Sequence, residues 1–157
     1  MKIFILTSLM FSYSLFASEI RLDCKKLLSG NSNGEAYTLA MDINAGVTID
    51  LNNEDAELRG TIVTKQGQYH RQGEVEDIVA FFTDGKKFQK DSSSVKISSF
   101  DRNLIMCGMT QSPCRKWEEM TVNLKSLEVF FERSHSYKAF GGDKTYSHSL
   151  KFRCTKI

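Results

Sequence analysis

Tyr146-Ser-His-Ser-Leu-Lys-Phe-Arg-Cys154, close to the C-terminus of the chain, alternates strictly between two kinds of side chain. The even-numbered positions hold the apolar or aromatic residues and end in a cysteine, and the odd-numbered positions hold serine, lysine and arginine. A period of two is typical of a β-strand with one buried face. The stretch therefore predicts a strand that places Cys154 on its buried face.

A second alternating segment lies near the other end of the chain, where apolar positions from Ile20 to Cys24 are separated by charged residues. Two terminal strands that each carry a cysteine on the buried face are expected to lie side by side, joined by a Cys24–Cys154 disulfide. The other two cysteines, Cys107 and Cys114, enclose a short segment rich in turn-forming residues. Four cysteines allow three pairings, and we expect the one in which Cys107–Cys114 is the second disulfide.

The N-terminal segment has the organisation of a secretory signal peptide. Lys2 supplies a positive charge, residues 3–16 form an apolar and hydroxyl-containing segment, and Ala17 is a small residue at the cleavage point. That segment is too short to cross a bilayer comfortably, since a spanning helix needs about 20 apolar residues. All four cysteines lie after it, as in proteins that form disulfides in an oxidising compartment. We therefore predict residues 1–17 as a signal peptide and 18–157 as one secreted or periplasmic domain.

Turn-forming residues punctuate the predicted mature chain at short intervals and separate segments in which apolar and polar side chains alternate. This organisation predicts an all-β fold, a single-domain antiparallel β-barrel or sandwich of about eight to ten strands. Residues 74–83 are ambiguous, because their apolar residues are spaced as on an amphipathic helix while the composition is rich in β-branched and aromatic residues. We expect a strand there, with a short helix as the alternative. Gly60, within a weaker alternating segment, suggests a bulge or a sharp bend.

Composition and motifs narrow the function. The formal net charge of +2 at pH 7 lacks the basic footprint of a nucleic-acid-binding protein. The polar faces of the alternating segments carry charges such as Arg21 and Lys151, whereas a lipid-facing barrel needs an apolar outer face. We therefore expect no transmembrane insertion of the mature chain. A nucleophile elbow, a phosphate-binding glycine loop and a C-x-x-C motif are all missing from the sequence, so we expect no cofactor and favour a binding module over an enzyme.

The C-terminal hairpin supplies the candidate site. The Gly-Gly pair at residues 141–142 favours a two-residue turn. That turn predicts a register in which Tyr137 faces Tyr146 and His135 faces His148. Every apolar position of one strand then meets an apolar position of the other on the same face, whereas a three-residue loop would put the two sets on opposite faces.

The inward face of this hairpin is expected to have an apolar zone toward the chain termini and a polar zone toward the turn. The polar zone holds the candidate ligand-binding residues Arg133, His135, Tyr137, Tyr146 and His148. The simplest interpretation is that the hairpin runs past the core and these residues are half-exposed cross-strand pairs. Alternatively, they line a small pocket, or His135 and His148 bind a metal with His70 or a carboxylate, since imidazole suits zinc, copper and nickel.

The leading functional hypothesis is a secreted or periplasmic binding module that holds a small ligand or an envelope or secreted protein and performs no chemistry. Two alternatives stay open. The first is a metal-dependent or hydrolytic enzyme that uses His135 and His148, and it predicts a bound metal. The second is a structural protein of the cell envelope, and it predicts an exposed apolar patch without an enclosed cavity.

Overall fold

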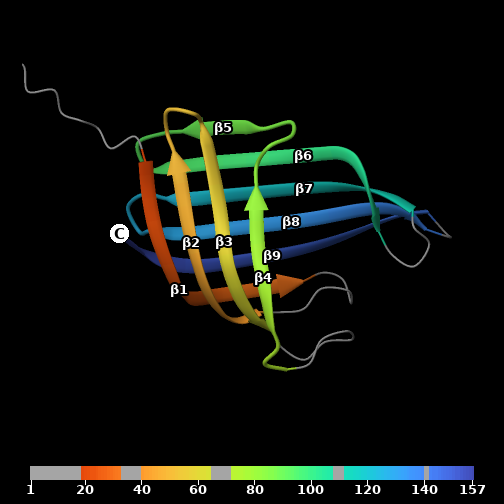
Figure 1. Cartoon of the computed structure of the whole chain (residues 1–157), viewed down its shortest axis with the longest axis horizontal. Coiled ribbons are helices and arrows are strands. Elements are labelled where there is room, and N and C mark those ends of the chain that lie inside the picture. Colours follow the sequence, from red (N-terminus) through yellow and green to blue (C-terminus); the bar gives the residue numbers. More distant parts are fainter. Residues whose placement is uncertain (1–18, 33–39, 65–71, 108–111, 140–141) are drawn as a thin grey trace, which may run out of the picture.

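The computed structural model describes residues 19–32, 40–64, 72–107, 112–139 and 142–157, which leaves the predicted signal peptide outside the described residues. These residues form nine strands (Figure 1). The strands are β1 (Glu19–Ser32), β2 (Ala40–Asp50), β3 (Asp55–Thr64), β4 (Val75–Phe81), β5 (Lys87–Lys90), β6 (Ser94–Cys107), β7 (Ser112–Asn123), β8 (Glu128–Ala139) and β9 (Gly142–Lys156). Within this part of the chain, no helix is long and apolar enough to span a membrane.

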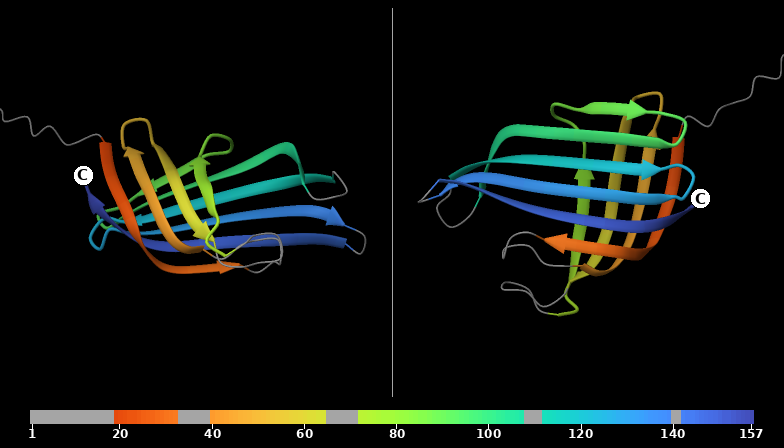
Figure 2. Two further views of the ribbon diagram at one scale, coloured as in Figure 1. Left: turned by 60° about the horizontal axis from the view of Figure 1, so that its bottom comes forward. Right: turned by 180° about the vertical axis from the view of Figure 1, so that it is seen from behind.

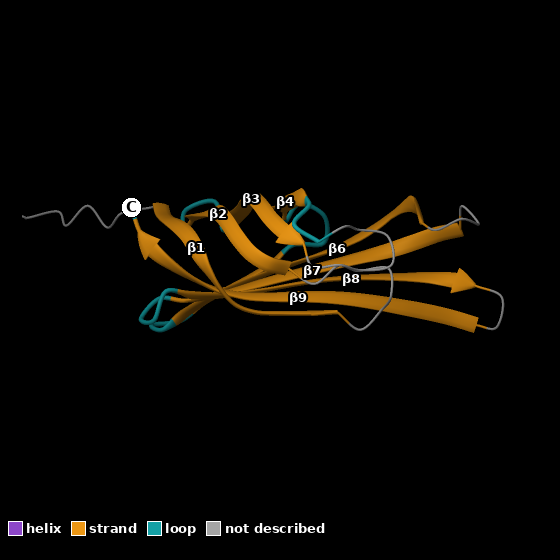
Figure 3. Cartoon of the chain, turned by 90° about the horizontal axis from the view of Figure 1, so that it is seen from below, coloured by secondary structure: helices purple, strands orange, loops and turns teal. Residues whose placement is uncertain are grey.

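All nine strands belong to one antiparallel sheet with the order β4-β3-β2-β1-β9-β8-β7-β6-β5. The sheet curls so that β1 to β4 lie across β5 to β9, which gives a half-barrel (Figures 1 and 3). The predicted all-β antiparallel fold is thus confirmed. Strands β4 and β5 follow one another in the chain but stand at opposite ends of the sheet order. They are the two edges of the sheet, and the barrel stays open between them.

The segment that was ambiguous in sequence, residues 74–83, contains strand β4, so the expectation of a strand is confirmed and the helix alternative is wrong. Strand β4 pairs with β3 along its whole length. Ile78 and Ala80 are buried, whereas Val79 and Phe81 on the other face are exposed. The apolar spacing imitates a helix because both faces of this strand carry apolar side chains.

The terminal strands β1 and β9 lie side by side in the middle of the sheet. Cys24 is directly opposite Cys154, and their sulfur atoms form a disulfide of 2.05 Å between two buried side chains. The predicted link between the ends of the domain is therefore confirmed. Cys114 is buried as well. The side chain of Cys107 lies outside the described residues, so the Cys107–Cys114 pairing stays a prediction.

Strand β1 belongs to both halves of the curl. Its N-terminal part pairs with β2 and its C-terminal part with β9. The register with β9 shifts between Cys24 and Lys26 and again between Leu27 and Ser29. Such bulges bend a strand and increase its twist. Figure 1 shows β1 turning from the direction of β2 to the direction of β9, and this bend sets the two halves of the sheet across each other.

Gly60 was predicted to mark a bulge or a sharp bend, and the strand register tests the first of these. Strand β3 keeps its register with β2 and with β4 through this position, so the expected bulge is wrong. A Cβ atom at Gly60 would overlap the backbone of Asn44 and Ala45 on β2. The glycine is therefore explained by the close approach of two backbones, the other common reason for a glycine within a strand.

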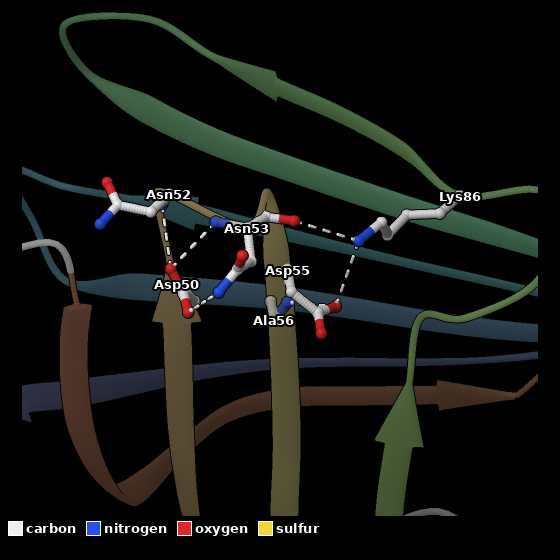
Figure 4. Close-up of polar contacts among 6 residues, drawn as sticks. All are labelled: Asp50, Asn52, Asn53, Asp55, Ala56 and Lys86. Atoms are coloured by element: carbon white, nitrogen blue, oxygen red, sulfur yellow. Dashed lines mark hydrogen bonds and ion pairs between the residues drawn. The ribbon is translucent and has the colours of Figure 1, made fainter.

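The polar turn between β2 and β3 contacts the other half of the half-barrel through Lys86 (Figure 4). Asp50 closes the turn between β2 and β3 by accepting hydrogen bonds from the amides of Asn52 and Asn53, at 2.9 and 3.1 Å. Lys86, which immediately precedes β5, donates to the Asn53 carbonyl oxygen at 3.3 Å and lies 3.7 Å from the Asp55 carboxylate. The edge strand β5 is thereby linked to the turn of the opposite half of the sheet.

Candidate functional site

The C-terminal hairpin pairs β8 with β9 in a register two residues away from the predicted one. His135 faces Tyr146, and His148 faces Arg133, so the predicted direct pairing of the two histidines is wrong. A shift of two residues keeps every side chain on its face, which is why alternation alone could not distinguish these registers. Gly142, predicted to lie in the turn, instead begins β9 with a φ of 118°, a conformation that glycine adopts readily.

The inner face of β6 to β9 carries rows of side chains that run across the strands. The last apolar row before the hairpin turn consists of Ile97, Met120, Phe131 and Leu150. The next row, here called the first polar row, consists of Ser99, Glu118, Arg133 and His148. The following row, here called the second polar row, includes Lys116, His135 and Tyr146. The same strands thus carry an apolar zone and a polar zone on one face, as the alternation predicts.

Glu118 is the centre of the first polar row. Its side chain is buried, with the residue 2% exposed. The Nε and Nη2 atoms of Arg133 both lie 2.6 Å from its Oε1 atom, and the Nζ atom of Lys116 lies 2.9 Å from the same oxygen. A buried carboxylate without such partners would be strongly destabilising. The three side chains therefore form one fixed charge cluster.

Arg133 also connects this cluster to the opposite half of the sheet. Its Nη2 atom donates a hydrogen bond of 2.6 Å to the backbone carbonyl oxygen of Val79, on edge strand β4. The guanidinium lies over the ring of Phe131, 5.4 Å from its centroid, at the border with the apolar rows. Arginine suits this position because its planar group presents several donors in fixed directions. Arg133 therefore positions β4 above the polar rows.

A cleft of about 210 Å³ lies between β4 and the inner face of β6 and β7. Its wall comes from β4 and the segment that follows it, and its floor comes from Ser99 and from Lys116 and Glu118 of the charge cluster. The lining residues are Val79, Phe81, Thr83, Asp84, Ser99, Lys116 and Glu118. The cleft occupies the side of β4 on which the sheet has no further strand, so it results directly from the incomplete closure of the barrel.

The two histidines of the polar rows favour the neutral form. Burial lowers the pKa of His148 to about 4, and the positive charge of Arg133 opposite it acts in the same direction. Burial is also the main cause that lowers the pKa of His135, followed by the charges of Arg133 and Lys116. Both imidazoles are therefore expected to be neutral at pH 7, where they can accept or donate a hydrogen bond without adding charge.

The structure brings some of the predicted site residues together and adds others. Arg133 contacts the floor of the cleft, while His135, Tyr146 and His148 are half-buried neighbours in the polar rows. The side chain of Tyr137 and the whole of His70 lie outside the described residues. Within the described part of the chain, no group of three or more histidine, cysteine, aspartate and glutamate side chains could hold a metal ion.

Ser99, Lys116 and Glu118 were not among the site residues predicted from the sequence. Neighbouring strand residues face opposite ways, so the adjacent carboxylates of Glu118 and Glu119 are not expected to act on one substrate. The structure agrees: Glu119 lies on the other face, 2.7 Å from Lys96. The available signal was the continuation of an apolar face, since the alternation of β7 leads from Met120 to a carboxylate at Glu118. A charge in such a register position indicates a buried ion pair.

Comparisons of the chain with protein-family models, with curated proteins and with solved structures returned no match.

Proposed function

We propose that this protein is a binding module of the periplasm or the extracellular space, and that the cleft beside β4 is its binding site. The observation that carries the proposal is the construction of the cleft. Its floor holds the buried carboxylate of Glu118, whose Oε1 atom contacts Arg133 and Lys116, and its wall is an edge strand of the sheet. Fixed polar groups in a concave site beside apolar side chains are the usual composition of a ligand pocket.

The charge cluster supports recognition better than it supports chemistry. A general base needs a free lone pair within reach of a substrate proton. The Oε1 atom of Glu118 already contacts the nitrogen atoms of Arg133 and Lys116. These contacts hold the charged groups in fixed positions, where they can bind a ligand of complementary charge. This arrangement favours a binding module. The enzyme hypothesis based on His135 and His148 stays a prediction, and elemental analysis of the purified protein tests its metal-dependent form.

The volume of the cleft limits what can bind there. About 210 Å³ is less than the roughly 300–1,000 Å³ of pockets for drug-sized ligands. The cleft therefore suits a small polar compound or a short part of a longer molecule.

A fragment screen by ligand-observed NMR tests the site. We expect polar fragments to bind the wild-type domain with dissociation constants of about 1 mM or lower. Ser99→Phe should abolish this binding, because Ser99 belongs to the floor and a phenyl ring would fill the cleft. Ser98→Phe is the matched control, since Ser98 is the adjacent residue on the opposite face of β6. A screen without binders, or binders that Ser99→Phe does not affect, would refute the proposed site.

The proposed location has its own test. A disulfide between Cys24 and Cys154 requires an oxidising compartment for its formation. Full-length protein expressed in a Gram-negative host should be recovered from the periplasm with its N-terminus near Ser18 and with this disulfide oxidised. Recovery from the cytoplasm with residues 1–17 still attached would contradict the proposal.

A further inference from the structure

We propose that the molecule recognised in the cleft is an extended, basic segment of another protein, which binds by adding a strand to the open edge of β4. The inference rests on the proposed function, because the added strand would lie in the same cleft. Addition of a strand to a sheet edge is an established mode of peptide recognition, in which backbone hydrogen bonds supply affinity and alternate side chains supply specificity.

The backbone of β4 is directed appropriately for such pairing. In an antiparallel pair, successive residues direct their backbone groups alternately toward and away from the neighbouring strand. The amide of Thr64 donates to the carbonyl oxygen of Glu74 at 2.8 Å, which places the even-numbered residues on the side of β3. The odd-numbered residues therefore direct their backbone groups toward the cleft. The hydrogen bond from Arg133 to the Val79 carbonyl agrees with this assignment.

The side chains of β4 also suit a partner strand. Val75, Val79 and Phe81 are 63%, 37% and 48% exposed, and all three lie on one face of the strand. They account for three of the five large apolar residues that are exposed in the described part of the chain. Apolar exposure is thus concentrated on a single edge strand, where a partner strand with alternating apolar residues would cover it.

The charge around β4 determines the chemistry of the partner. Residues 72–85 contain four carboxylates, those of Glu74, Glu76, Asp77 and Asp84, and no lysine or arginine. The cluster at Glu118 has two cations, Arg133 and Lys116, for its one carboxylate, so it offsets one of these four negative charges and the surroundings of β4 stay acidic. An incoming segment with lysine or arginine between its apolar residues would be complementary to β4. A second β4 strand would instead place carboxylates against carboxylates.

The other edge of the sheet shows what a protected edge looks like in this fold. Strand β5 has four residues, and Lys87 and Lys90 stand at its two ends. Short length and lysine side chains are common features that prevent edge-to-edge association. Strand β4 is longer, with seven residues, and has no lysine. The two open edges are therefore not equivalent, and β4 is the one suited to pairing.

Arg133 would change its partner when a segment binds. An added strand would supply its own amide to the Val79 carbonyl, which now accepts from the Arg133 guanidinium. The guanidinium would keep a contact with Glu118, since its Nε atom donates to Glu118 and not to Val79. In the free protein the Val79 carbonyl oxygen thus accepts from Arg133, and in the complex it would accept from an amide of the bound segment.

The test uses synthetic peptides of seven residues, the length of β4, in which lysine and valine alternate. Isothermal titration calorimetry at low ionic strength should show binding of this peptide. The peptide with glutamate in place of lysine should bind about tenfold more weakly or not at all, because it meets the carboxylates of β4. The same Lys-Val peptide N-methylated at alternate residues should also lose binding, since it cannot donate to the edge.

Two variants at Val79 separate the contribution of its backbone amide to peptide binding from that of its side chain. Val79→Pro removes an amide that faces the cleft and leaves the β3 pairing of its neighbours in place, so it should weaken peptide binding about tenfold or more. Val79→Thr keeps the amide and should bind within a fewfold of wild type. If Val79→Pro does not fold, the N-methylated peptide gives the same information on the wild-type protein.

The outcomes are distinguishable. Equal binding of the two charge types would overturn the basic character of the partner, and undiminished binding of the N-methylated peptide would overturn strand addition. A wild-type protein that sediments as a dimer, and becomes monomeric on Val79→Pro, would show that a second copy occupies the edge and would also overturn the proposal. Fragments that bind the cleft while the peptides do not would refute this inference and leave the proposed function standing. Failure of both probes would refute both.

Discussion

The apolar and polar halves of the inner face are built from the same four strands, β6 to β9, but they are stabilised in different ways. In the apolar half, Phe131 and Leu150 are buried and gain stability from their removal from water. In the polar half, Glu118 is equally buried but depends on contacts with Arg133 and Lys116. The comparison shows that alternation determines which face of the sheet a residue occupies. The position of the residue along the strand determines whether apolar side chains or charged partners surround it there.

The covalent link of the apolar half should have the largest effect on stability. Cys24 and Cys154 are separated by 130 residues, and a disulfide that closes a loop of this length stabilises by about 5 kcal/mol in the chain-entropy model. We expect the double variant Cys24→Ala, Cys154→Ala to lose most of that free energy of unfolding. Urea denaturation of the oxidised wild type and the variant measures it, and a difference below about 1 kcal/mol would contradict the central role of this link.

Phe131 tests the packing of the apolar half without changing any covalent bond. Phe131 is buried, so we expect Phe131→Ala to lower the free energy of unfolding by about 4 kcal/mol through lost burial and a cavity. Phe130 is the matched control, because it is the adjacent residue and is exposed on the opposite face. Phe130→Ala should cost about 1 kcal/mol or less. Similar losses for the two variants in thermal or urea denaturation would show that the assigned face of β8 is wrong.

Much of the apolar half could be predicted from the sequence, because it depends on local pattern. The nine-residue alternation that ends at Cys154 specifies a strand and its buried face. The matching pattern around Cys24 then makes these two cysteines neighbours, as the structure confirms. The same reasoning placed Arg133, His135 and His148 on the inward face, because their positions continue the alternation.

The arrangement of the polar half could not be predicted from the alternation of apolar and polar residues, because it depends on the strand register and on the curl of the sheet. The shift of His148 from His135 to Arg133 leaves every face unchanged, so only the geometry of the turn and of the neighbouring strands decides it. The cleft depends on how far the sheet curls, which brings β4 over β7 although they are distant in the sheet order. Figure 2 shows that β6 to β9 extend well beyond β1 to β4 on the side of the hairpin turn.

The polar half should also give the protein a dependence on pH that the apolar half lacks. Burial, with the charge of Arg133, lowers the pKa of His148 to about 4, whereas an unfolded histidine has a pKa of about 6.5. Between these values the unfolded chain binds a proton that the folded chain does not bind. The free energy of unfolding should therefore fall by about 3 kcal/mol as the pH falls from about 6.5 to about 4. Urea denaturation at several pH values measures this loss.

His148→Gln isolates the contribution of this group. The variant cannot be protonated at position 148, so its free energy of unfolding should change less over the same pH range. Asp91 titrates elsewhere: hydrogen bonds from Ser93 and Ser94 lower its pKa from 3.8 to about 2. The stability that Asp91 contributes is lost only as the pH falls below about 4. The two windows are therefore separate, and an unchanged pH slope in His148→Gln would contradict the assignment.

The smallest effect on the free energy of unfolding is expected when a charged side chain of the polar half is replaced by an apolar one. Arg133→Met removes one of the two cations that contact Glu118, and Lys116 keeps the other contact. Loss of one partner from a buried pair is destabilising, but the contact that remains limits the expected loss to about 2 kcal/mol. Urea denaturation of the single variant measures this loss.

The double variant Glu118→Leu, Arg133→Met removes the buried carboxylate together with one of its two cations. It should recover part of the stability, because apolar replacement of a buried ion pair is often neutral or stabilising, while the Lys116 ammonium group loses its partner. It should nevertheless lose fragment binding, because the charged floor of the cleft has gone. Recovery of stability without recovery of binding would mean that the polar half is retained for recognition. Equal loss of stability in the single and double variants would instead mean that the ion pair is part of the scaffold.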